Sequence, residues 1–299
     1  MKILNELNGI VLVNKEKGYT SHDVVNIIRK ILGTRKVGHT GTLDPNAEGI
    51  LPICVGKSTK VSDMLVNSDK TYTAKIQLGI TTDTYDIWGK VLSENSVNVS
   101  YQQLSDAVAA FTGEFMQLPP MYSAVKINGK KLYELARKGI EAERKPRRIT
   151  VYKSEISDFD GNSFKLSVFC SKGTYIRSLC HDIGEKLGCG AAMTELVRTH
   201  SSVFDIKESL TLEEIRHTAE EKGPEAVLKP VDSVFGQYEK ITVTDIVRQR
   251  LLNGAVSRSA ENTGVYRVYD VNGIFVGIAE VFESEKGNAI KIVKAFCDR

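Results

Sequence analysis

GHTGTLDPNAEGILP, residues 38–52, is a short polar stretch, punctuated by glycines, that lies between two apolar runs. Its Asp44 stands directly before Pro45, and its histidine is His39. Glycine permits backbone angles that other residues resist, and a following proline biases Asp44 toward an extended conformation. This loop would therefore present the carboxylate, although by itself an Asp-Pro pair among glycines is more typical of a surface turn.

The composition is that of a globular protein and does not indicate a partner. The chain has 299 residues, 41% hydrophobic and 26% charged, which suits one large domain, or one large and one small. A formal net charge of +3 is too small to indicate a nucleic-acid-binding protein. Any such argument must come from how the charges are distributed.

Cysteine spacing and hydropathy favour a cytoplasmic protein. The five cysteines form no CxxC pair and no zinc-type spacing with histidine, which is typical of reduced thiols. The apolar run near the amino terminus is too short for a signal peptide, and no stretch has the length that crosses a bilayer, so no membrane partner is expected. The cysteines are Cys54, Cys170, Cys180, Cys189 and Cys297.

Apolar periodicity predicts strands mixed with helices through most of the chain. The expected strands cover residues 9–14, 50–56 and 70–79, with a hairpin over 152–170. The expected helices cover residues 22–32, 57–70, 100 to near Gly113, and 173–188. A linker near Pro230 precedes a small strand-rich unit of about sixty residues. There, Asn272-Gly273 between two alternating runs is the strongest hairpin signal of the chain.

Residues 119–148 are unusually basic. Nine cations stand against three carboxylates, and two tyrosines are interleaved. A charge run is commonly a solvated face, but this excess mixed with aromatic rings favours contact with nucleic-acid phosphates. The cations are Lys126, Lys130, Lys131, Arg137, Lys138, Arg144, Lys145, Arg147 and Arg148, and the tyrosines are Tyr122 and Tyr133.

Other candidate side chains lie in separate stretches. Tyr72 shares one face of the 70–79 strand with apolar residues, so it is either a core tyrosine or a functional one. Arg177 falls in or near the first turn of a helix, where the helix dipole disfavours a cation unless an anion is bound. Asp83 and Asp86 lie in a polar loop that would, in isolation, be a capped turn.

Several common catalytic motifs are excluded. GKST at residues 56–59 resembles the end of a phosphate-binding P-loop, but Leu51 occupies the position that requires glycine. The chain has no HExxH, no GxSxG and no GxGxxG between a strand and a helix. We therefore expect no metal site and no cofactor, and a site built from a carboxylate, a tyrosine and an arginine.

Six stretches, in order and over nearly the whole chain, closely resemble the tRNA pseudouridine synthases of the TruB type. Several long motifs in register are far more specific than any one of them. The stretches are NGIVLVNKEKGYTSHDVV, GHTGTLDPNAEGILP, KTYTAKIQLGITTDTYD, PPMYSAVKINGKKLYELAR, CSKGTYIRSLCHDIGEKLGCGA and LVRT. The carboxyl-terminal unit resembles a PUA domain, an RNA-binding β-barrel.

The resemblance implies a fold and a division of the chain. The expected fold is α+β, with a central mixed, mostly antiparallel sheet flanked by helices, followed by a small PUA-like barrel. Residues 1–234 would form the catalytic domain, with a basic RNA-binding insertion at about 121–148, and residues 235–299 the PUA-like domain. We expect a monomer with no obligate protein partner.

The resemblance also implies the reaction, which is isomerisation to pseudouridine of one uridine in the T loop of tRNA, conventionally numbered 55. Asp44, Tyr72 and Arg177 match the family's catalytic aspartate, active-site tyrosine and paired arginine. The expected substrate-binding residues are His39, which contacts the remodelled T loop in the family, together with Lys15, Asp86, Tyr175, Lys126, Lys130, Lys131, Arg147 and Arg148. The family commonly carries a basic residue and a glycine where this chain has His200, Ser201 and Ser202.

The chemistry fits these residues. The glycosidic bond must break, the uracil must rotate, and C5 must join C1′, with no redox step and hence no cofactor. Asp44 would act as a nucleophile, at ring C6 or at the sugar, or as the base of a glycal route. Tyr72 would stack on the uracil and take part in proton removal at C5, and His39 would fill the space of the extruded base.

Two rival functions remain open at this point. The same scaffold would serve a protein that binds or folds tRNA without modifying it. Asp44 paired with Asp83 or Asp86 would suit a glycosidase-like enzyme, but the basic segment does not suit a neutral sugar.

Overall fold

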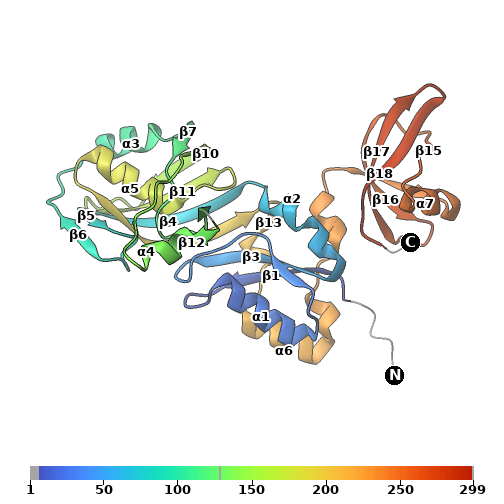
Figure 1. Ribbon diagram of the computed structural model, residues 1–299, viewed down its shortest axis with the longest axis horizontal. Coiled ribbons are helices and arrows are strands. Elements are labelled where there is room, and N and C mark those ends of the chain that lie inside the picture. The colour runs from blue at the N-terminus through green and yellow to red at the C-terminus, as the bar shows by residue number, and fades with distance from the viewer. Residues whose placement is uncertain (1–6, 128, 298–299) are drawn as a thin grey trace.

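The computed structural model describes residues 7–127 and 129–297 and is built around two sheets, a larger one and a carboxyl-terminal one (Figure 1). The larger sheet confirms the predicted architecture, because only β3 and β12 pair in parallel and all its other neighbours are antiparallel. Its central path is β1 (Gly9–Lys15), β3 (Glu48–Val55), β12 (Ala191–Ser201), β4 (Lys70–Leu78), β11 (Ser163–Cys170), β10 (Arg147–Ser157) and β7 (Gly113–Gln117), with β2 (Val37–His39) on β3 and β13 (Phe204–Asp205) on β12.

Two pairs of helices pack against this sheet, α1 beside α6 and α3 beside α5 (Figure 1). The helix α1 begins after Thr20, which forms a reciprocal capping box with Asp23, and ends at Gly33 in the left-handed conformation (φ 63°), as its sequence predicts. The bounds are α1 (Ser21–Leu32), α2 (Ser62–Val66), α3 (Tyr101–Ala109), α5 (Ile176–Leu187) and α6 (Leu212–Lys222).

The main core lies between the sheet and these helices and fixes the position of α5. Apolar side chains of β1, β3, β4, β11 and β12 meet those of α1, α3 and α5. At Gly184 of α5, a Cβ atom would lie 2.2 Å from the backbone nitrogen of Ala191, so only glycine allows α5 to approach the start of β12 this closely. The helix that carries Arg177 is thereby seated against the strand that carries Arg198.

Two expected helices are shorter than the sequence suggests. The helix expected to reach Gly113 ends at Ala109, since Gly113 adopts a positive φ (102°) and opens β7. The helix expected over 57–70 is a 3-10 turn, Gly56–Val61, followed by α2. The Ser58 hydroxyl donates to backbone carbonyls and accepts from Val55 N, which ties this turn to the end of β3.

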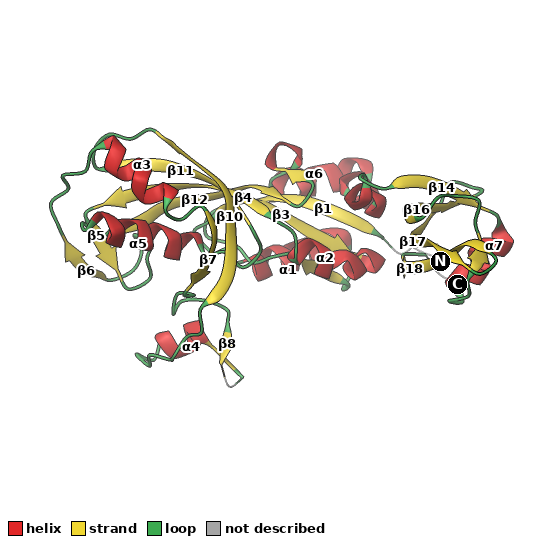
Figure 2. Cartoon of the chain, turned by 90° about the horizontal axis from the view of Figure 1, so that it is seen from above, coloured by secondary structure: helices red, strands yellow, loops and turns green. Residues whose placement is uncertain are grey.

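Two small hairpins extend from the large unit. One pairs β5 (Ile80–Thr82) with β6 (Val91–Glu94) and lies beside α5, and the other pairs β8 (Lys126–Ile127) with β9 (Lys130–Lys131), just before α4 (Leu132–Ala136). Figure 2 shows that β8 and α4 project away from the sheet, below the start of β10. The basic segment is therefore a protrusion for most of its length.

The carboxyl-terminal unit is a five-stranded sheet with one helix, α7 (Asp245–Leu252). The hairpin predicted at Asn272-Gly273 joins β16 to β17, with Gly273 at φ 78°. The Phe235 ring lies tilted against those of Phe275 and Phe296 and packs in the same cluster as Ile10 of β1, so an apolar core joins this unit to the large one. The strands, in order, are β14 (Glu239–Val243), β16 (Gly264–Asp270), β17 (Phe275–Ser284), β18 (Gly287–Ala295) and β15 (Ser257–Arg258).

Among residues 7–127 and 129–297, no helix is both long enough and apolar enough to span a membrane.

Candidate active site

Asp44 lies in the loop between β2 and β3, and hydrogen bonds fix this loop beneath it. Leu43 N donates to the Ser21 hydroxyl at 2.9 Å, and this hydroxyl donates back to Leu43 O. The backbone nitrogen and the hydroxyl of Thr40 both donate to Pro52 O, at 3.2 and 3.1 Å, which closes the loop. The Asp44 side chain is nevertheless 42% exposed. The loop therefore holds its backbone still and leaves the carboxylate within reach of a substrate.

Arg198 is buried under the same loop and connects its two ends. Its side chain is 1% exposed, its Nε donates to Ile50 O at 2.8 Å, and its Nη2 donates to Gly41 O at 3.2 Å. Gly49 adopts φ 104°, and a Cβ atom there would lie 2.3 Å from the backbone oxygen of Arg198. Only glycine fits at this crossing of β3 and β12, so the glycines of the loop serve close packing as well as turning.

Arg177 joins three segments at the carboxylate. Its Nε lies 2.9 Å from Asp44 Oδ2, and its Nη1 lies 3.6 Å from Asp86 Oδ2. Its Nη1 also donates to Thr84 O at 3.1 Å, and its Nη2 donates to Tyr122 O at 2.7 Å. The guanidinium is only 6% exposed. The unfavourable position of a cation in the first turn of α5 is therefore explained by two carboxylates and two carbonyls that face it.

Tyr72 lies opposite Arg198 across the β4–β12 pairing, partly buried against the main core. Burial raises the pKa of the Tyr72 phenol above its ordinary value, and the charge of Asp44 acts in the same direction while that of Arg198 opposes it. Tyr72 therefore lies at the edge of the core within the electrostatic influence of both Asp44 and Arg198, which suits an aromatic ring that contacts the uracil.

His39 stands at the start of the loop as a neutral ring. Gly41 N donates to its Nδ1 at 3.3 Å, so Nδ1 is an acceptor and the proton of the neutral ring is on Nε2. Burial lowers the pKa of His39 below its ordinary value, and the charges of Arg198 and His22 lower it further. A neutral ring suits insertion among bases better than it suits a salt bridge with a phosphate.

Lys15 does not lie where a substrate-binding lysine must lie, and this prediction needs correction. The side chain is fully buried, and its ammonium donates to Glu16 O, Tyr19 O and Pro45 O at 2.9, 2.8 and 3.1 Å. All three N–H groups are used by backbone carbonyls. Because Pro45 follows Asp44 directly, Lys15 positions the loop from below and has no donor left for RNA.

Replacing Lys15 by methionine should flatten the dependence of stability on pH. Burial lowers the pKa of Lys15 to about 8, with Glu48 and Asp44 opposing this shift. The unfolded lysine keeps its proton up to its ordinary pKa of 10.5, so the unfolded state binds more protons between these values. The cost of burying the charge therefore lowers the free energy of unfolding below about pH 8. As the pH rises from there toward 10.5, the free energy of unfolding increases by up to about 1.4 kcal/mol per pH unit.

Urea unfolding at about pH 7, 9 and 10 measures this effect. The free energy of unfolding of the wild type should rise over this range relative to that of Lys15→Met. Lys17→Met is the matched control, because Lys17 is exposed and pairs with Glu48 at 3.4 Å. An equal pH dependence in wild type and Lys15→Met would contradict a buried ammonium.

Asp86 faces the Arg177 guanidinium from the opposite loop, whereas Asp83 does not. Asp86 Oδ1 accepts from the Thr84 hydroxyl at 2.7 Å, and burial raises the pKa of the Asp86 carboxyl despite this bond and Arg177. Asp83 accepts from Lys90 N at 2.7 Å and closes its own loop. A raised carboxyl pKa beside Asp44 is also what a glycosidase needs, so the pair of carboxylates alone does not separate the two kinds of enzyme.

Tyr175 and Gln117 hold the start of α5. Gln117 Oε1 accepts from Tyr175 N at 2.8 Å, and Gln117 Nε2 donates to Tyr175 O at 3.0 Å. Sequence reasoning assigned no role to Gln117 or to Arg198. For Arg198 a signal was present, because LVRT is one of the stretches that match the family pattern. For Gln117 there was none, since its partner is 58 residues away.

The predicted basic insertion divides into two parts. Lys126, Lys130 and Lys131 lie in the β8–β9 protrusion, where Lys131 Nζ is 5.3 Å from the centre of the Tyr133 ring. The other two cations, Arg147 and Arg148, begin β10 and belong to the large sheet, and Arg148 pairs with Glu114 of β7 at 3.3 Å. The protrusion begins where Tyr122 O binds Arg177, so it is connected to the site by a direct hydrogen bond.

The His200–Ser202 departure from the family pattern forms a tight hairpin. Ser201 pairs with Phe204, and His200 Nε2 lies 3.1 Å from Asp205 Oδ2. Ser202 takes φ 58°, a region that favours glycine. A glycine at position 202 would adopt this φ without backbone strain.

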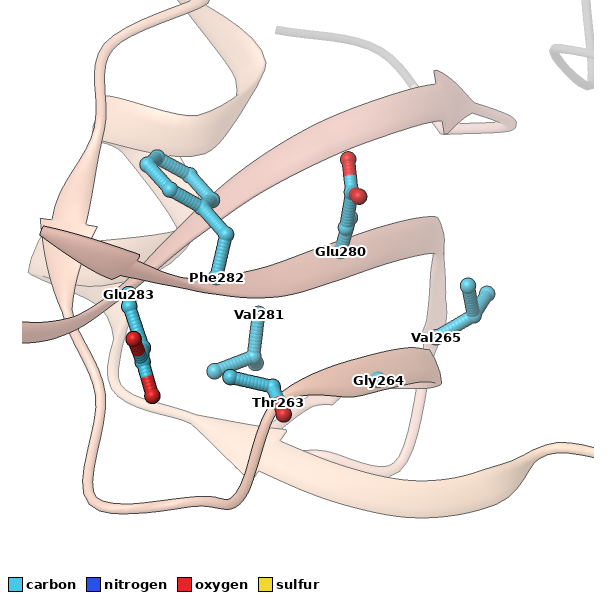
Figure 3. A pocket seen from close by; sticks show the side chains of 7 residues that line it. All are labelled: Thr263, Gly264, Val265, Glu280, Val281, Phe282 and Glu283. Atoms are coloured by element: carbon cyan, nitrogen blue, oxygen red, sulfur yellow. The ribbon is translucent and has the colours of Figure 1, made fainter.

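A hollow of about 540 Å³ lies on the carboxyl-terminal sheet, between β16 and β17 (Figure 3). Glu280 and Glu283 contribute carboxylates to its lining, and Phe282 contributes a ring. Glu280 pairs with Lys291 at 3.1 Å, so its charge is balanced by a neighbouring cation. Within the part of the chain that the structure describes, no group of three or more His, Cys, Asp or Glu residues could hold a metal ion.

Comparison with known families accounts for most of the chain. Residues 29–176 match the model described as TruB family pseudouridylate synthase (N terminal domain). Residues 177–236 match the model described as tRNA pseudouridylate synthase B C-terminal domain. The tRNA pseudouridine synthase B of Alkaliphilus oremlandii is 48% identical over 248 residues, which are 83% of this chain and 82% of that protein. The tRNA pseudouridine synthase B of Clostridium kluyveri is 43% identical over 300 residues, which are 97% of this chain and 100% of that protein.

Solved structures share the fold. The crystal structure of a Cbf5-Nop10-Gar1 complex contains a chain with a TM-score of 0.72 and 27% identity, covering 97% of this chain and 85% of that one. The crystal structure of the archaeal box H/ACA sRNP Nop10-Cbf5 complex contains a chain with a TM-score of 0.68 and 26% identity. The match covers 97% of this chain and 86% of that one.

Proposed function

Because the chain belongs to the TruB family of pseudouridylate synthases, we propose that it isomerises a uridine of tRNA, the T-loop uridine conventionally numbered 55, to pseudouridine. The observation that carries this proposal within the molecule is the ion pair between exposed Asp44 and buried Arg177. The relatives named above are tRNA pseudouridine synthases, which favours this function over a glycosidase and over a tRNA-binding protein without activity.

Asp44 is the reacting group of this proposal. The reaction breaks the bond between C1′ and N1, turns the uracil and joins C1′ to C5, and the proton at C5 is finally lost. A carboxylate can begin this sequence by attacking ring C6, by attacking the sugar, or by removing a sugar proton. Arg177 binds Asp44 Oδ2 and thereby fixes the direction in which the carboxylate is presented.

The other members of the site position the base. Tyr72 would stack on the uracil and take part in proton removal at C5. A base within a folded RNA loop must leave its stack to reach Asp44, and the neutral His39 ring would fill the space that it leaves. Asp86 and Tyr175 would act through Arg177, the first by its charge and the second by its place at the start of α5.

The remaining surfaces would hold tRNA. We propose that residues 1–234 form the catalytic domain, and that residues 235–299 form a PUA-like domain that supports the tRNA on the acceptor-stem side. Lys126, Lys130 and Lys131 would contact the RNA backbone from the protrusion. A tRNA substrate would place the reaction in the cytoplasm, with the chain acting as a monomer and without a cofactor.

Release of tritium tests the activity. With T-loop RNA that carries tritium at C5 of the target uridine, the protein should release the label to water in step with pseudouridine formation. A control RNA with the target uridine replaced by cytidine and tritium at another uridine should release none. Tight binding without release would instead support a tRNA-binding protein and overturn the isomerase.

Removing the basic side chains should weaken tRNA binding and flatten its dependence on salt. Replacing Lys130, Lys131, Arg147 and Arg148 together by alanine removes up to four phosphate contacts, and each lost contact lowers the slope of log K against log salt by about 0.7 to 0.9. The measurement is tRNA affinity at several salt concentrations. Separate double variants, Lys130–Lys131 and Arg147–Arg148, would show which part of the divided segment binds RNA. An unchanged slope would contradict the proposed role.

A further inference from the structure

The loop between β5 and β6 exposes the only tryptophan of the chain, Trp88. Its side chain is 48% exposed, and Ile87, Val91 and Leu92 in the same hairpin are exposed as well. Single exposed apolar residues are ordinary, but an exposed indole among three exposed aliphatic side chains is typical of a contact surface. Figure 1 shows this hairpin beside α5, the helix that carries Arg177.

This loop is rigid, so the indole is held in place before any partner arrives. Tyr85 takes φ 65°, which is unusual for a residue with a side chain, and its ring stacks on His181 of α5 with centroids 4.0 Å apart and planes within 9°. Met193 N donates to Tyr85 O at 3.1 Å, and Ile87 N donates to Met193 O at 2.9 Å. At Gly89, a Cβ atom would lie 2.2 Å from the Thr84 hydroxyl.

A short chain of polar contacts links Trp88 to the reacting group. Trp88 N donates to Asp86 Oδ1 at 3.2 Å, and Asp86 Oδ2 lies 3.6 Å from Arg177 Nη1. Arg177 Nε in turn lies 2.9 Å from Asp44 Oδ2. The backbone of Trp88 is therefore connected by three polar contacts to the site that would receive the extruded uridine, and its indole is exposed. Lys90, exposed and two residues further on, supplies a positive charge next to it.

We propose that Trp88 is a substrate-binding residue that stacks on a base of the RNA loop next to the extruded uridine, with Lys90 contacting the adjoining phosphate. The inference rests on the proposed function. Unstacked bases of RNA loops bind aromatic side chains, and each such stack contributes about 1–3 kcal/mol, which is roughly 5- to 150-fold in affinity. The position of the loop beside Asp86, Arg177 and Asp44, where the RNA loop must lie for the proposed reaction, favours RNA over an apolar protein partner.

Intrinsic fluorescence tests the contact directly. Trp88 is the only tryptophan of the chain, so all tryptophan emission comes from it. In an Asp44→Asn background, which prevents turnover, addition of T-loop RNA should quench the emission and protect it from iodide. Quenching that depends on protein concentration without RNA would indicate contact between two copies and overturn the inference. Emission that stays unchanged while a filter assay shows RNA bound would overturn it too.

Kinetics supply the second readout. Trp88→Ala should raise KM for T-loop RNA about 10- to 100-fold and change kcat less than about threefold, whereas Trp88→Phe should recover most of the loss. Tyr101→Ala on α3 is the matched control, an exposed aromatic whose removal should leave KM unchanged. A wild-type KM in a folded Trp88→Ala would refute the contact while the isomerase stands. Quenching in a protein that releases no tritium would support the contact while the proposed activity fails.

Discussion

Asp44→Asn should abolish tritium release, by about 10⁴-fold or more, while tRNA affinity stays within about threefold of the wild type. Each route open to Asp44 uses a carboxylate electron pair, as a nucleophile or as a base, and an amide supplies neither. The structure predicts that the loop survives the change. Ser21, Thr40 and Arg198 fix its backbone, and the amide oxygen can still accept from Arg177 Nε.

Asp83→Asn is the matched control for this experiment. Asp83 lies in the neighbouring loop and accepts from Lys90 N, which an asparagine oxygen can also do, so release should stay near the wild-type rate. The control also addresses the glycosidase-like pairing of Asp44 with Asp83, which would require both carboxylates. If Asp44→Asn lost tRNA affinity together with activity, Asp44 would be a structural residue and not the reacting one.

Local chemistry made much of this site predictable from sequence. Proline after Asp44 and glycine around it indicated a presented carboxylate, which the structure bears out in an exposed side chain on a fixed backbone. The cation in the first turn of α5 indicated an anionic partner, which is now Asp44 with Asp86. Both inferences used rules that depend only on residues close in sequence.

Tertiary burial was beyond the reach of the same rules. Lys15 was expected to bind substrate, but β1 pairs with β3 so that Lys15 lies opposite Gly49, and the ammonium ends beneath Pro45. Arg147 and Arg148 follow a basic run in sequence, yet pairing with β7 takes them into the large sheet. Charge and periodicity do not reveal which strands become neighbours, so they could not separate a buried cation from an exposed one.

The loss of Arg177 should be the most damaging change to the site as a whole. In Arg177→Met, the partly buried Asp86 carboxylate loses its cation, and Thr84 O and Tyr122 O lose their donor. Breaking a buried ion pair on one side costs about 3–5 kcal/mol of unfolding free energy. Activity should fall about 10³-fold, because Asp44 is no longer oriented. Arg177→Lys should recover little of it, since an ammonium cannot span four acceptors.

A double variant separates the two effects of Arg177. Adding Asp86→Asn to Arg177→Met removes the unpaired buried carboxylate, so urea unfolding should show part of the lost stability restored, while tritium release stays at the level of the single variant. Arg216→Met on α6, which breaks an exposed pair with Glu213, is the control and should cost less than about 1 kcal/mol. Activity that returned with stability would mean that Arg177 only supports the fold. Stability alone returning would mean that the guanidinium serves catalysis through its hold on Asp44.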